Sequence, residues 1–130
     1  MRSTATLWRT IPLIERLLAH SRRRWRNLGE LQSDPDCNNG IDDDGNGFID
    51  DCWGYNFAEN SGGSNLMGSD WHGTHVAGIV AADTDNGRGV SGTAWKASLM
   101  TLTCFGTSRS GGFEQSIVYA ADNGAAISQK

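Results

Sequence analysis

The sequence predicts an α/β fold in which helices pack on a parallel β-sheet. Apolar and β-branched residues run almost without interruption through "ASLMTLTCF" (97–105), which is typical of a strand buried on both faces. Stretches with helical spacing precede and follow it, at 72–82 and 112–123. Helices that alternate with buried strands favour a parallel sheet, because parallel strands are joined by crossover connections.

The first 30 residues differ in charge from the rest of the chain. They hold seven arginines against two glutamates, whereas residues 31–130 hold four basic residues against thirteen acidic ones. Apolar residues recur at helical spacing over 7–18, and the basic cluster "HSRRRWR" (20–26) follows. This Arg-rich amphipathic pattern is similar to an organelle transit peptide. A surface helix with a basic face, or a segment without native structure, remains the alternative. We therefore expect a folded core in residues 31–130 and a separate basic segment in 1–30.

Residues 33–52, "SDPDCNNGIDDDGNGFIDDC", are loop by composition and suggest a calcium site. Four oxygen-bearing residues fall at ligand positions 1, 3, 5 and 9 of a calcium loop: Asp42, Asp44, Asn46 and Asp50. Gly47 falls at position 6, where the backbone must turn sharply. Position 12 is Trp53 instead of the usual glutamate, so we expect weaker binding than in a complete loop. The alternative is an acidic turn without metal.

The three cysteines do not form a fully paired set. Cys37 and Cys52 bracket the acidic loop and could form a disulfide that restricts it. Cys104 lies in the apolar stretch 97–105, where it is expected to be a small buried apolar side chain.

Beyond the loop, short strands and helices are expected to alternate. "WGYNF" (53–57) is a candidate strand, and a helix over 72–82 would take Asp70 as its N-cap. The helix over 112–123 would be stopped by Gly124, and "AAIS" (125–128) would begin another strand. The apolar residues of the 112–123 helix predict which side it buries: Phe113, Ile117, Val118 and Ala121.

His72 and His75 allow three interpretations. As zinc ligands they would share a helical face, but the usual spacing is four residues with an intervening Glu, and no third ligand is evident. They could also be ordinary structural histidines. In the third interpretation His72 is a catalytic base at a helix N-terminus. Small residues in this stretch would let the helix approach a sheet and a substrate closely: Gly73, Ala77 and Gly78.

The stretch "HGTHVAG" (72–78) resembles the histidine motif of the subtilisin-like serine endopeptidases. The resemblance extends over about residues 25–129 and includes further stretches: "WRNLGE" (25–30), "NNGIDDDGNGFIDDCWGYNF" (38–57), "GVSGTAWKASLMTLTCFG" (89–106) and "SGGFEQSIVYAADNGAAIS" (110–128). It implies part of a Rossmann-like, three-layer parallel-sheet domain that is truncated at both ends. Trp71 departs from the family, which usually has a small residue before this histidine.

The resemblance also implies an activity, the hydrolysis of peptide bonds by a Ser-His-Asp triad. His72 would be the base, His75 would be structural, and Ser110, Gly111 and Gly112 would border an extended polypeptide substrate. The Asp and Ser motifs of the family are not found, and "GTS" (106–108) comes too early to supply the nucleophile. We therefore expect a partial protease that is inactive alone. The alternative is a non-catalytic calcium-binding or interaction module.

Composition argues against two other classes of function. The acidic balance of residues 31–130 would repel phosphate, so nucleic-acid binding is not expected. No run of 18 apolar residues exists, so a membrane span is not expected either. By family resemblance the protein would be extracellular, although no signal peptide is visible.

Overall fold

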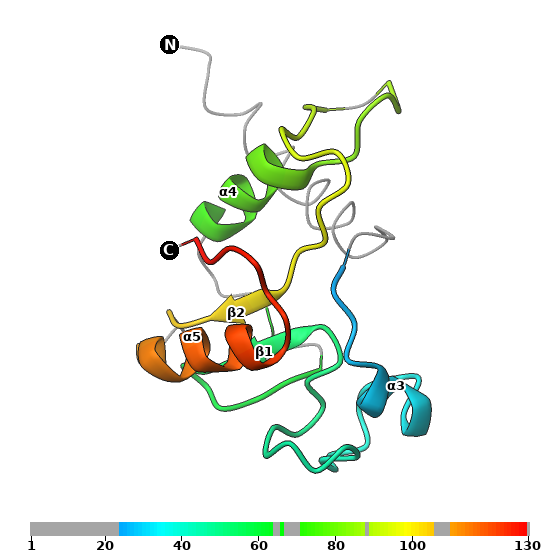
Figure 1. Ribbon diagram of the computed structural model, residues 1–130, viewed down its shortest axis with the longest axis vertical. Helices are drawn as coiled ribbons and strands as arrows, with labels where there is room; N and C mark the ends of the chain where they lie inside the picture. Colours follow the sequence, from blue (N-terminus) through cyan, green and yellow to red (C-terminus); the bar gives the residue numbers. More distant parts are fainter. Residues whose placement is uncertain (1–23, 64–65, 67–70, 88, 106–109, 130) are drawn as a thin grey trace. The chain divides into compact units, whose positions relative to one another are not determined.

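The computed structural model describes residues 24–129, apart from 64–65, 67–70, 88 and 106–109. The expected helix over 7–18 and the Asp70 cap lie outside the described residues. Five elements follow in the order α3 (Leu28–Ser33), β1 (Gly54–Asn56), α4 (Trp71–Ala81), β2 (Thr101–Thr103) and α5 (Phe113–Asp122) (Figure 1). The described residues divide into two compact units. One holds Arg24 and residues 71–99, and the other holds 25–63, Leu66 and the described part of 100–129.

A parallel pair of strands forms the centre of the larger unit. β1 and β2 pair in the register Gly54 with Thr101, Tyr55 with Leu102 and Asn56 with Thr103. Gly54 has a φ of +132°, and a Cβ added there would lie 1.9 Å from the Thr101 carbonyl oxygen. Only glycine therefore allows the two backbones to approach this closely. The α/β class and the parallel pairing agree with the sequence-based expectation.

Aromatic side chains fill the space beside β1. Four rings, Phe48, Tyr55, Phe57 and Tyr119, form five edge-to-face pairs with ring centroids 4.9–5.7 Å apart. Such edge-to-face pairs stabilise a core beyond the area that they bury. Helix α5 contributes Tyr119 to this cluster and thereby joins the segment after β2 to the acidic loop.

The buried side of α5 is not the one that the sequence predicts. Ser116, Tyr119 and Ala120 are buried. The side chains expected to be buried are exposed: Phe113, Ile117, Val118 and Ala121. The prediction was wrong because Tyr119 joins the aromatic cluster and turns its own side of the helix inward.

Two strand predictions also need correction. β2 covers only Thr101–Thr103, and its residues are half-buried, not buried. Residues 125–128 form no strand; Gly124, with a φ of +77°, ends α5 as expected, and an irregular segment follows.

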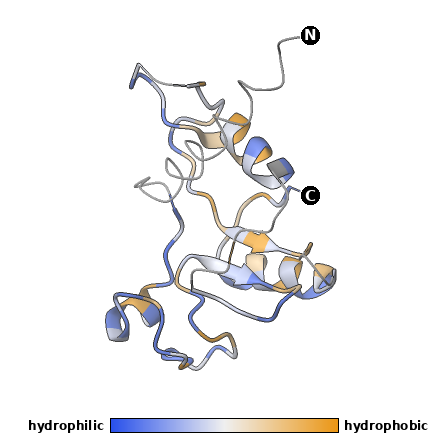
Figure 2. Ribbon diagram, turned by 180° about the vertical axis from the view of Figure 1, so that it is seen from behind, coloured by the Kyte–Doolittle hydropathy of each residue, from blue (hydrophilic) through white to orange (hydrophobic). Residues whose placement is uncertain are grey.

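Cys104, which was expected to be buried, is a free thiol that is only half-buried. β1 is the more hydrophilic of the two strands (Figure 2).

Helix α3 was not predicted and crosses the boundary expected near residue 31. Asn27 caps it, because its Oδ1 accepts from the Gly29 N–H at 3.0 Å. The Asn27 N–H in turn donates to the Cys52 carbonyl at 2.9 Å, so the start of the helix is fixed to the end of the acidic loop.

The smaller unit is built around α4. Thr74, Gly78 and Ala81 are buried at helical spacing. The segment after the helix packs on it closely, and a Cβ on Gly92 would lie 2.5 Å from the Ala82 nitrogen. Hydrophobic and hydrophilic residues alternate around this helix (Figure 2). No helix in the described part of the chain has the length and apolar character needed to cross a membrane.

Candidate functional site

His72 lies in the first turn of α4 with its side chain exposed. His75, one turn further on, is exposed as well. Of the small residues near them, Gly73 is exposed as well and Gly78 is buried.

The segment expected to border a substrate follows β2. Ser110 forms an antiparallel bridge with Phe105, and the Gly111 N–H donates to the Cys104 carbonyl at 2.9 Å. Gly112 stands at the N-cap of α5 with a φ of +72°, and a Cβ there would lie 2.3 Å from the Cβ of Phe57. Glycine is therefore required at 112 both for its backbone conformation and for the close contact.

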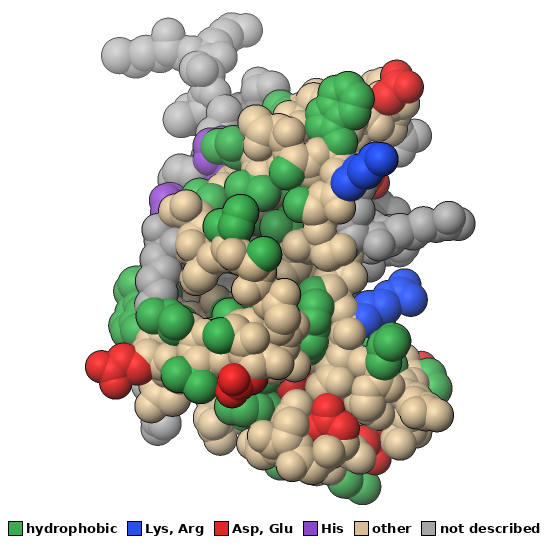
Figure 3. Space-filling view, viewed as in Figure 1, with side chains coloured by type: hydrophobic (Ala, Val, Ile, Leu, Met, Phe, Trp, Pro, Cys, Tyr) green, Lys and Arg blue, Asp and Glu red, His purple; other side chains and the backbone are tan. Residues whose placement is uncertain are grey.

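The acidic loop is organised by short hydrogen bonds to its own backbone. Asp42 accepts from the N–H groups of Gly45, Asn46 and Gly47 at 2.7–3.0 Å. Asp44 Oδ1 accepts from the Asn46 N–H at 3.1 Å. These bonds hold Asp42 and Asp44 against the backbone of the turn over 45–47. Acidic side chains lie on the surface of this part of the chain (Figure 3).

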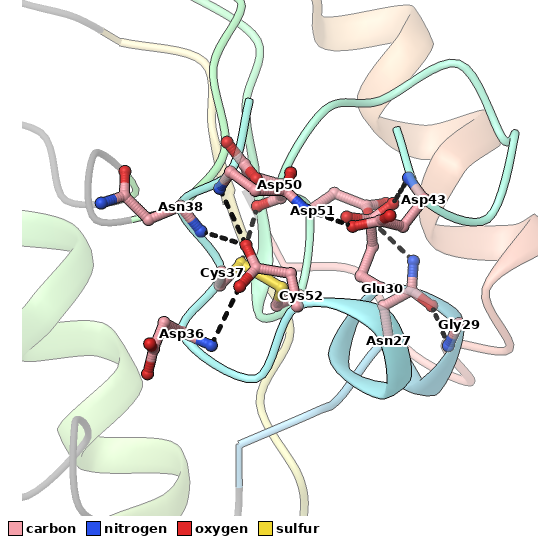
Figure 4. The surroundings of a disulfide bond; sticks show 12 residues. Asn27, Gly29, Glu30, Asp36, Cys37, Asn38, Asp43, Asp50, Asp51 and Cys52 are labelled. Carbon is pink, nitrogen blue, oxygen red and sulfur yellow. Dashed lines mark hydrogen bonds between the residues drawn. A yellow bond between two sulfur atoms is a disulfide. The ribbon is translucent and has the colours of Figure 1, made fainter. Parts of the chain in front are cut away.

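Glu30, which belongs to α3 and not to the loop, joins these carboxylates. One carboxylate oxygen each from Glu30, Asp42 and Asp44 lies within 4.8 Å of the other two. Glu30 is fully buried, and its Oε1 accepts from the N–H groups of Asp43 at 2.8 Å and Asp44 at 3.3 Å (Figure 4). No described residue donates to Oε2. Burial raises the pKa of Glu30, the two N–H groups lower it, and the neighbouring carboxylates raise it further.

The other predicted loop ligands have different partners. Asn46 donates through Nδ2 to Asp44 at 3.3 Å and to Asp51 at 2.9 Å. Asp50 lies outside the three-carboxylate group, and its oxygens accept from the Gly40 N–H at 3.2 and 3.3 Å. The backbone of Asp50 lies in the left-handed region, with a φ of +53°. Glu30, and not Asp50, is the third carboxylate of the group that the described residues form.

Asp51 is a second buried carboxylate beside the loop. Its Oδ1 accepts from Asn27 Nδ2 at 2.7 Å, and its Oδ2 accepts from the Tyr119 hydroxyl at 2.5 Å and from Asn46. Burial raises the pKa of Asp51, and these three donors lower it. Burial and the Asp51 carboxylate both raise the pKa of Tyr119, so its hydroxyl stays protonated as a donor. The network ties α3, the acidic loop and α5 together.

Cys37 and Cys52 form a disulfide that closes the loop at its base (Figure 4). Asp34, just before it, accepts from the N–H groups of Asn38 at 2.5 Å, Asn39 at 2.8 Å and Asp36 at 3.2 Å. These N–H groups, led by that of Asn38, hold the pKa of Asp34 below its usual value.

Sequence reasoning missed four polar residues of this region: Asn27, Glu30, Asp51 and Tyr119. The pattern of a calcium loop covers only 42–53, so residues outside that window carried no signal. The one signal in the sequence was Trp53 at position 12, where a complete calcium loop has a glutamate. The histidine motif and the acidic loop lie in different units of the structure.

Comparison with known proteins supports the resemblance seen in the sequence. Residues 29–129 match the model of the family described as "Subtilase family". Subtilisin-like protease 1 of Plasmodium falciparum is 45% identical over 74 residues, 57% of this chain and 10% of that protein. Thermitase of Thermoactinomyces vulgaris is 42% identical over 77 residues, 57% of this chain and 27% of that protein. A cell wall-associated protease of Bacillus subtilis is 42% identical over 77 residues, 57% of this chain and 8% of that protein. The matched residues thus span between 8% and 27% of the length of these relatives.

Proposed function

The chain belongs to the subtilase family, and from this premise we propose that it is the segment of a subtilisin-like serine endopeptidase that supplies the catalytic base, His72. The observation that carries the proposal is the motif "HGTHVAG" on α4, with His72 exposed in the first turn. The aspartate and serine of the triad would come from parts of a longer protein. That division is supported by the small share of each relative that the chain spans.

In such an enzyme His72 takes the proton of the serine hydroxyl and returns it to the leaving amine. A buried aspartate holds the imidazole in the tautomer and orientation that this transfer needs. The loss of that aspartate alone costs about 10⁴ in rate, and the loss of one oxyanion donor costs roughly 10²–10³. The 130-residue chain by itself should therefore be inactive.

The substrate in this proposal is an extended polypeptide that pairs beside Ser110, Gly111 and Gly112. The close contact of Gly112 with Phe57 supports this, because it fixes the segment to the aromatic core. The proposal places the enzyme outside the cell, as the family membership and the cell wall-associated relative suggest.

Calcium is the proposed structural cofactor of the acidic loop. Asp42 and Asp44 are supported as ligands by their position beside Glu30, and oxygen donors of this kind suit Ca²⁺. Asn46 stays a candidate ligand through its loop position, whereas Asp50 is not supported. A bound ion would neutralise the carboxylates and hold the loop in one conformation.

The same carboxylate group favours one alternative function, a calcium-binding module without catalysis. The two proposed functions predict different sequences in the complete reading frame that encodes the chain. We expect the complete transcript to contain in-frame Asp and Ser motifs of the family. A frame that lacks both would favour the module.

The product of the complete frame provides the activity test. His72→Ala should lower peptide hydrolysis by about 10⁴-fold or more. His75→Ala is the matched control and should keep labelling by a fluorophosphonate probe. The 130-residue chain should not be labelled. A labelled band from that chain that disappears on His72→Ala would contradict its expected inactivity.

A further inference from the structure

We propose that Glu30 of α3 is a calcium ligand through Oε2 and closes the site formed by Asp42 and Asp44. This inference rests on the proposed calcium site and extends it beyond the loop. It supplies from upstream the acid that position 12, Trp53, does not provide.

The first argument is the state of the Glu30 carboxylate. The side chain is fully buried, and Oε1 is occupied by the N–H groups of Asp43 and Asp44. Oε2 has no donor among the described residues. A buried carboxylate oxygen without a partner is costly unless a cation or a donor satisfies it. An ion coordinated at Oε2 would remove that cost.

The second argument is that α3 is held against the loop at this point. Asn27 Nδ2 donates to Asp44 Oδ2 at 2.8 Å. A Cβ on Gly29 would lie 2.5 Å from the Cβ of Asp44, so the absence of a side chain there allows the contact. Glu30 is therefore positioned by the residues on its N-terminal side.

The third argument is charge. Three carboxylates converge within 4.8 Å, and the sequence contains no lysine or arginine between Arg26 and Arg88. Like charges this close repel one another strongly at a partly buried site. Ca²⁺ takes six to eight oxygen ligands in a flexible arrangement, so it fits a site in which one carboxylate comes from a neighbouring helix.

The test measures calcium affinity of the metal-free 130-residue chain by titration calorimetry. Glu30→Gln removes the charge and keeps the shape, and it should weaken binding by roughly tenfold or more, since affinity follows ligand charge. Glu114→Gln, on the exposed side of α5, is the matched control and should bind like the wild type.

The possible outcomes separate the role of Glu30 from the proposed calcium site as a whole. Equal affinity of wild type and Glu30→Gln would overturn the role of Glu30 and leave a calcium loop. No calcium binding by the wild type would overturn both. Should Glu30→Gln lose the native circular dichroism spectrum, amide NMR of the wild-type chain decides. Calcium should then shift the Gly29 and Leu31 amides with the same dissociation constant as the Asn46 amide, and shifts confined to the loop would refute the inference.

Discussion

Tyr119→Phe tests whether the buried Asp51 network stabilises the fold. The change removes one hydroxyl, which donates to Asp51 Oδ2 at 2.5 Å between two fully or almost fully buried side chains. A hydrogen bond to a charged group contributes about 1.5–3 kcal/mol. Asn27 and Asn46 still donate to Asp51, so we expect a loss of about 2 kcal/mol, in the lower part of that range.

Urea unfolding followed by tryptophan fluorescence measures this loss. At an m-value of about 2 kcal/mol/M, the midpoint should fall by about 1 M. Tyr55→Phe is the matched control, because its hydroxyl contacts Asn60 Oδ1 at 3.3 Å, a longer bond between neutral groups. That variant should lose about 0.5 kcal/mol or less. Equal shifts for the two variants would refute the reasoning.

The pH dependence of the Tyr119→Phe effect has a definite sign. Burial raises the pKa of Asp51, whereas the Tyr119 hydroxyl favours the ionised form and lowers it. Removal of the hydroxyl therefore raises the pKa of Asp51 further. The resulting loss in the free energy of unfolding is present above the pKa of Asp51. The cost should shrink as the pH falls through that value, because a neutral carboxyl depends less on the donor. A cost that grows at low pH would contradict this assignment.

Three further perturbations can be followed in the same assay. The pKa of Asp34 is lowered by backbone N–H groups, so its stabilisation is present above the unfolded pKa of about 3.9 and is lost as the pH falls through the folded value. Asp34→Asn should thus lower the midpoint at pH 7 and have no effect near pH 2; equal effects at both would refute this. Gly112→Ala should cost about 1–3 kcal/mol, because its φ is +72° and the new Cβ would lie 2.3 Å from that of Phe57; an unchanged midpoint would refute this. Reduction of the bond between Cys37 and Cys52, 15 residues apart, should cost about 3 kcal/mol, and no shift would mean that other contacts hold the loop.

Much of the fold could be predicted from local patterns. The helices near 72–82 and 112–123 were found within one or two residues, because their spacing and the stop at Gly124 are local properties. The alternation of strands and helices predicted a parallel sheet, whereas the pairing of 54–56 with 101–103 is seen only in the structure. The buried side of α5 was predicted wrongly, because Tyr119 packs on Phe48 and Phe57, which lie more than 60 residues earlier.

The sequence alone determined the candidate functional motifs: the motif that carries His72, a calcium-type loop at 42–50 and two cysteines that bracket it. Each of these is a pattern of neighbours along the chain, so its spacing is visible without coordinates. Only the tertiary structure decided which carboxylates meet. It brings Glu30 from α3 beside Asp42 and Asp44 and leaves Asp50 with Gly40. The physical reason is that a metal site is defined by distances of a few ångströms between oxygens, and here those distances are set by backbone turns and by the contact of α3 with the loop.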